Sequence, residues 1–131
     1  MSQSTARLAD GPILLRNTMR IKEGHLEKYR DAVRSAVDFV REHGPQLMVE
    51  VFIDEANLRA YSFQLYLDSA AVLKHWQLAD PYIQEVMEHC SVEALDVYGQ
   101  PSKEVMDGLT QNGGTASLVV TPHLTGFFRH R

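Results

Sequence analysis

The chain has 131 residues, of which 44% are hydrophobic, and its 17 acidic and 13 basic side chains give a formal charge of -4. This length and composition predict one domain with a single hydrophobic core, and the lack of basic runs argues against nucleic acid as a partner. The lone cysteine, Cys90, excludes an intrachain disulfide, and the scattered histidines predict no metal site held by the protein. A reducing cytoplasm is the expected compartment.

The first dozen residues, 1–12, are polar and are expected to form a loose leader. They lack the apolar stretch of a signal peptide, and nowhere does the chain approach the roughly 18 apolar residues that span a bilayer. We therefore expect no association with a membrane.

The first half of the folded region predicts a strand, a helix and a hairpin. Alternating apolar and polar side chains predict a strand at 13–21. Apolar residues spaced three and four apart predict an amphipathic helix that follows the turn 22–24 and ends at Gly44-Pro45. Two β-prone runs, 46–54 and 58–67, are predicted to form a hairpin.

The second half predicts a helix and a strand. Asp68 or Ser69 can cap a helix that should break at Asp80-Pro81, because proline disrupts a helix interior, and a new helix should then run to about His89. Alternation at 91–98 predicts a fourth strand.

This β-α-β-β-α-β order predicts an α+β, ferredoxin-like domain over residues 13–100, with a four-stranded antiparallel sheet and both helices on one face. The other face would carry apolar side chains without a cover. A second copy of the chain is the simplest cover, so we expect a homodimer.

Residues 101–131 are predicted to be a C-terminal extension. It contains a short capped helix at 102–109, a flexible link at 112–114 and a β-prone run at 117–121. This extension is long enough to reach the partner subunit and add a strand to its sheet edge.

Two residues are the first candidates for a site. Asn17 is the only polar residue on the inward face of the first strand, where Met19 follows it. A buried amide needs hydrogen-bond partners, which are either neighbouring backbone or a ligand in a pocket between sheet and helices. Trp76 shares a helical stripe with Val72 and Leu73, so it is either a core residue or part of the wall of that pocket.

Other candidates lie on the second helical region. Tyr82 and His89 are seven residues apart, which would place them on the same side of one helix, about 10 Å apart. A histidine at the border of an apolar stripe titrates near neutrality and can act as a base, or it can be a solvated imidazole. The same two interpretations apply to His75.

Residues 14–99 resemble the antibiotic biosynthesis monooxygenase superfamily, whose members are dimeric α+β barrel proteins. The resemblance rests on the strand Leu15–Ile21 with the turn Lys22-Glu23-Gly24, on the helix that follows, and on the block from His75-Trp76 to Asp80-Pro81-Tyr82. The superfamily includes cofactor-free oxygenases of aromatic and quinol-like substrates, haem-degrading oxygenases and many proteins of unknown activity.

The resemblance to the oxygenase branch implies that Trp76 and Tyr82 line a substrate pocket. It implies no cofactor, because the anion of a phenolic substrate would itself reduce O2. Asn17, and with it His75 or His89, would orient the substrate and stabilise that anion.

The resemblance to the haem-degrading branch is less complete. Asn17 and Trp76 stand where that branch has an asparagine and a tryptophan, but Val86 occupies the position expected for the haem ligand, and His89 comes almost a turn later.

Three hypotheses about function follow. The first is a cofactor-independent monooxygenase acting with O2 on a small aromatic or quinol-like substrate. The second is a haem-binding oxygenase. The third is a non-enzymatic dimer that binds a small ligand, and it predicts a pocket too small or too polar for an aromatic ring. The sequence alone leaves all three open, and it does not identify the substrate.

Overall fold

The computed structural model describes residues 11–114 and 116–129, so residues 1–10 of the expected leader lie outside it. The elements run in the order β1 (Ile13–Ile21), α2 (Leu26–His43), β2 (Met48–Asp54), β3 (Arg59–Tyr66), α3 (Ser69–Met87), β4 (Cys90–Tyr98), α4 (Lys103–Gly113) and β5 (Ser117–Thr121). The β-α-β-β-α-β order predicted for the first six elements is confirmed.

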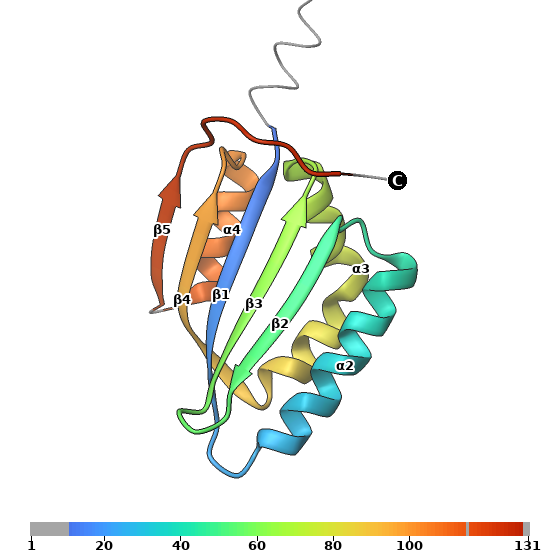
Figure 1. Cartoon of the computed structure of the whole chain (residues 1–131), viewed down its shortest axis with the longest axis vertical. Helices are drawn as coiled ribbons and strands as arrows, with labels where there is room; N and C mark the ends of the chain where they lie inside the picture. Colours follow the sequence, from blue (N-terminus) through green and yellow to red (C-terminus); the bar gives the residue numbers. More distant parts are fainter. Residues whose placement is uncertain (1–10, 115, 130–131) are drawn as a thin grey trace, which may run out of the picture.

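The strands form one sheet in the order β2-β3-β1-β4-β5, and the three helices lie on one face of it (Figure 1). β1 pairs antiparallel with β3 and β4, and β2 pairs antiparallel with β3. The α+β, ferredoxin-like fold expected from the sequence is therefore the observed one, with a fifth strand added.

The fifth strand belongs to the C-terminal extension. β5 pairs in parallel with β4 of the same chain, with Leu118 opposite Leu95 in the register. We expected this strand to pair with the sheet edge of the partner subunit. It instead extends the sheet of its own chain. The predicted flexible link is also more ordered than expected, because Asn112 and Gly113 are the last residues of α4.

The predicted helix break at Asp80-Pro81 is wrong. α3 is a single helix of 19 residues that continues through Pro81. Proline lacks the N–H that would bond to the carbonyl four residues earlier, so it removes one hydrogen bond of the helix. Buried residues on both sides of it, Val72, His75 and Ala79 before and Cys90 beyond the helix, tie the segment to the rest of the molecule.

Local signals fix where the helices begin and end. The Asp68 carboxylate accepts a hydrogen bond of 2.9 Å from the Ala71 backbone N–H at the start of α3. The Ser102 hydroxyl accepts one of 3.3 Å from the Val105 N–H at the start of α4. α2 ends directly before Gly44, as predicted.

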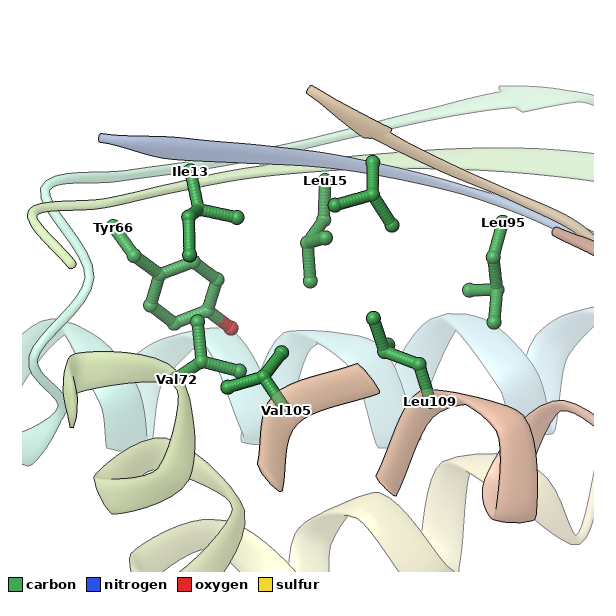
Figure 2. Close-up of a cluster of buried hydrophobic side chains, with 8 residues drawn as sticks. Ile13, Leu15, Tyr66, Val72, Leu95, Val105 and Leu109 are labelled. Atoms are coloured by element: carbon green, nitrogen blue, oxygen red, sulfur yellow. The ribbon is translucent and has the colours of Figure 1, made fainter. Parts of the chain in front are cut away.

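The core consists of two clusters on the helix side of the sheet. The larger one joins the start of β1, the end of β3 and the second half of β4 to α3 and α4 (Figure 2), and its buried members are Ile13, Leu15, Tyr66, Val72, Leu95, Val97, Val105 and Leu109. The smaller one contains Ile21, Tyr29, Ala60 and Cys90. Because Ile13 and Leu15 belong to the first cluster and Ile21 to the second, the middle of β1 lies between them.

Candidate active site

A cavity of about 470 Å³ lies between the sheet and the helices, and residues from both core clusters line it. This volume is within the range of sites for small molecules. Five of the six residues proposed from the sequence line this one cavity: Asn17, Met19, His75, Trp76 and Tyr82.

Asn17 occupies the middle of β1 on the helix side of the sheet, opposite Ser62 of β3. No hydrogen bond joins its side chain to another residue within 11–114 or 116–129. Of the two interpretations of this amide, the structure therefore favours the one in which it is available to a ligand in the cavity.

Trp76 contributes an indole ring to the wall of the cavity from α3. The ring lies against Gly108 of α4, where a Cβ atom would overlap its six-membered edge. Glycine at this position therefore lets α4 approach the indole closely and fixes where the ring can lie.

Tyr82 lines the cavity from the second half of α3. Its ring stacks on Phe39 of α2, with ring centroids 4.4 Å apart and an interplanar angle of 20°. This contact holds the phenol ring between α2 and α3.

His89 is the predicted site residue that does not line the cavity. α3 ends at Met87, so His89 follows the helix, and its Nδ1 lies 3.1 Å from Nδ1 of His25. Its Nε2 lies 3.1 Å from a carboxylate oxygen of Glu85. Both ring nitrogens thus engage protein groups, and this residue, which the haem hypothesis requires, is not placed to meet a ligand in the cavity.

His75 is buried in α3 and contacts a polar group that the sequence analysis did not identify. Its Nδ1 lies 2.9 Å from Nε2 of Gln46, which follows the end of α2. The same Gln46 nitrogen donates to Oε1 of Gln64 at 3.4 Å. The Tyr66 hydroxyl also donates to that Gln64 oxygen, at 2.5 Å, and Gln64 donates to Ser62 at 3.3 Å.

A sequence signal for part of this network exists. Ser62, Gln64 and Tyr66 alternate along β3 and face the helices together with Ala60, in the same way as Asn17 on β1. Polar residues on an inward strand face therefore identify Ser62 and Gln64 by the rule that identified Asn17. Gln46 lies outside the regular elements, and no periodic pattern points to it.

The groups that line the cavity are almost all uncharged. Burial lowers the pKa of His75 to about 4, so the ring is neutral at pH 7. Burial also raises the pKa of the Tyr66 phenol, which therefore stays protonated. Among the described lining residues, Asp80 is the one with a charged side chain, and it is exposed. The cavity therefore suits a neutral ligand with few polar groups.

The described part of the chain contains neither a metal-binding cluster nor a membrane-spanning helix. No group of three or more His, Cys, Asp or Glu side chains in 11–114 and 116–129 is arranged to hold a metal ion. Within the same ranges, no helix has the length and apolar character needed to cross a bilayer.

Comparison with known proteins gave matches among solved structures alone: no family model and no curated protein matches the chain. MupZ from Pseudomonas fluorescens matches with a TM-score of 0.70 and 15% identity over 92% of this chain and 96% of MupZ. A Caulobacter crescentus protein, provisionally assigned as an antibiotic biosynthesis monooxygenase, has a TM-score of 0.59 and 11% identity over 72% of this chain and 92% of its own.

SnoaB from Streptomyces nogalater, described as a cofactor-independent oxygenase, matches with a TM-score of 0.59 and 7% identity over 71% of this chain and 96% of SnoaB. At these identities the likeness concerns the arrangement of the backbone. The chain therefore has the α+β fold of the antibiotic biosynthesis monooxygenase structures.

Proposed function

We propose that this protein is a cofactor-independent monooxygenase that oxidises a small, neutral phenol or quinol. The observation that carries the proposal is the cavity, in which the free Asn17 amide and the Trp76 indole line one largely apolar space. The shared fold with SnoaB, a cofactor-independent oxygenase, adds support at the level of architecture.

The proposed reaction needs no electrons from the protein. A phenol with a free ring position reacts with O2 so that one oxygen atom forms a new C=O bond and the other leaves as water. The ring C–H and the phenolic O–H are both lost, so the substrate supplies all four electrons and becomes a quinone. The protein has to hold the ring, bind the developing phenolate oxygen and exclude water.

The lining residues match these tasks. The Asn17 amide is a hydrogen-bond donor without a partner among the described residues, so it can bind the phenolate oxygen as negative charge develops there. Trp76, Met19 and Tyr82 provide flat or flexible apolar surface for an aromatic ring. In this scheme the first proton of the substrate leaves through solvent, because a ring with a pKa near 4, such as His75, is a weak base.

Oxygen consumption with a panel of mono- and bicyclic phenols tests the proposal. We expect turnover above the rate in buffer, and kcat/KM for the Asn17→Ala, Trp76→Phe double variant should fall at least about tenfold, because a donor to the developing anion and part of the wall are lost.

Asn57→Ala is the matched control, because Asn57 is exposed in the β2–β3 turn and is not part of the cavity wall. It should keep wild-type turnover. Equal rates for the double variant and the wild type would reject the assignment of Asn17 and Trp76, and inactivity toward every phenol would reject the reaction.

A further inference from the structure

The amide of Gln46 lies between His75 and Gln64 at the wall of the cavity. Its Nε2 is 2.9 Å from Nδ1 of His75 and 3.4 Å from Oε1 of Gln64. Its Oε1 is buried and has no hydrogen-bond partner in the described part of the chain. The direction of this amide decides which nitrogen of the His75 ring carries the proton.

Two arrangements of the network are conceivable, and they differ in what they leave unpaired. In the observed one, the Gln46 NH2 group donates twice and the Tyr66 hydroxyl donates to Gln64 Oε1, which leaves one carbonyl oxygen, Gln46 Oε1, without a partner.

In the reversed arrangement, Gln46 Oε1 would accept from His75, and Gln64 would have to turn over to avoid placing two oxygens together. Tyr66 would then face an NH2 group and lose its acceptor, and the Gln46 NH2 group would occupy the site that has no partner. Buried donors without acceptors are rarer in proteins than buried carbonyls without donors. The observed arrangement is therefore the more stable one.

In that arrangement Nδ1 of His75 accepts a hydrogen bond, so the proton of the neutral ring is on Nε2. No hydrogen bond in the ranges 11–114 and 116–129 occupies Nε2, although His75 itself lines the cavity. The Nε2–H group is not fully buried, so a ligand in the cavity can reach it.

We propose that Gln46 is a positioning residue that holds His75 as the Nε2–H tautomer, so that this ring donates a hydrogen bond to an oxygen atom of the substrate. The inference rests on the proposed function and narrows it. The substrate carries an acceptor oxygen, a phenolate or ring carbonyl, on the side of the cavity that His75 lines, in addition to the oxygen that meets Asn17.

Two donors suit a substrate with two oxygen atoms, such as a phenol that also carries a ring carbonyl. A neutral imidazole donates without bringing charge into an apolar cavity, where an unpaired charge would be costly. The hydrogen bond from His75 Nε2–H to the second substrate oxygen would then strengthen as negative charge moves onto that oxygen.

The tautomer is measured directly in the wild-type protein by long-range ¹H–¹⁵N spectra of the histidine rings at pH 7. We expect the Nε2–H pattern for His75, identified by the loss of its signals in His75→Phe. An Nδ1–H pattern would overturn the proposal whatever the activity of the protein, and no variant has to fold for this result except to identify the signals.

Binding of 5-hydroxy-1-tetralone, which carries both a phenol and a ring carbonyl, tests the consequence by calorimetry. Gln46→Met removes the donor at similar volume, so His75 should become a mixture of tautomers and the affinity for 5-hydroxy-1-tetralone should fall about five- to tenfold. In the His75→Phe background the same substitution should have no further effect, because Gln46 acts only through that ring.

Gln111→Met is the matched control, because Gln111 is exposed on α4 and is not part of the cavity wall. It should leave both the tautomer and the affinity unchanged. Unchanged affinity in Gln46→Met, an equal loss in the two backgrounds, or no binding of 5-hydroxy-1-tetralone by the wild type would each overturn the proposal. Binding with the expected tautomer but without phenol oxidation would reject only the proposed reaction.

Discussion

His75 links the stability of the protein to pH. Burial lowers its pKa from 6.5 to about 4, so between these values the unfolded chain binds a proton that the folded protein does not. The contribution is complete above pH 6.5 and is lost as the pH falls toward 4. We expect this residue to remove about 2 kcal/mol of the free energy of unfolding between pH 7 and pH 5.

Urea unfolding at pH 7 and pH 5 measures this effect. His75→Gln keeps a polar side chain that does not titrate, so the pH-dependent loss should be smaller in this variant by about the same amount. Identical losses in the variant and the wild type would show that the ring is not buried in its neutral form.

The residues of the candidate site differ in how well a sequence can reveal them. Asn17 interrupts the apolar face of β1, and Trp76 continues the apolar stripe of α3. A periodic apolar face of this kind predicts the direction in which a side chain points. His89 was judged from the same periodicity, but α3 ends at Met87, so the helical phase does not extend to it. Gln46 lies outside any periodic element, and its place at His75 depends on the tertiary structure.

At the scale of elements, α3 remains one continuous helix although Pro81 lies inside it. Pro81 is exposed, and the carbonyl of Gln77 has no N–H to bond to at that position. Pro81→Ala restores this donor and should raise the free energy of unfolding by about 1 to 2 kcal/mol, after subtracting the entropy that proline removes from the unfolded chain.

A shift of the urea midpoint checks this prediction. Lys74→Ala is the control, because Lys74 is exposed on the same helix and its backbone N–H is already available for the helix, so its effect should stay within about 0.5 kcal/mol. A midpoint that stays the same or falls in Pro81→Ala would mean that the helix bends to accommodate the ring.

Local patterns predicted the strands, the β2–β3 hairpin and the starts of the helices, and failed on the partner of β5 and on the continuity of α3. β1 and the cap at Asp68 follow from alternation and from one hydrogen bond, both of which are local. The partner of β5 is not local, because a short β-prone run fits the edge of any sheet. The continuity of α3 through Pro81 likewise depends on packing that no short window contains.

At the scale of the molecule, the sheet face opposite the helices exposes large apolar side chains. Phe52 is 57% exposed, Val119 51% and Tyr98 39%, and they come from β2, β5 and β4. Phe52 packs edge-on against Phe63, with ring centroids 5.9 Å apart, so this face also holds an aromatic pair. Large apolar side chains gathered on one exposed face are unfavourable in water.

We propose that two copies of the chain cover this face by forming a homodimer. Light scattering at micromolar concentration should give the mass of a dimer, and Phe52→Glu should give a monomer, because it places a charge in the apolar contact. Leu78→Glu is the control, because Leu78 is a similarly exposed apolar residue on α3, in the helix layer. A monomeric wild type, or dissociation by Leu78→Glu alone, would contradict this assembly.

The chain contains a single tryptophan, and that residue is Trp76. All indole emission of the protein therefore originates at the wall of one cavity, beside α4. A small molecule that contacts this ring should change the wavelength or intensity of the tryptophan emission. A molecule that binds far from the cavity should leave the emission unchanged. The unmodified protein thus carries its own optical probe for surveying large collections of small molecules.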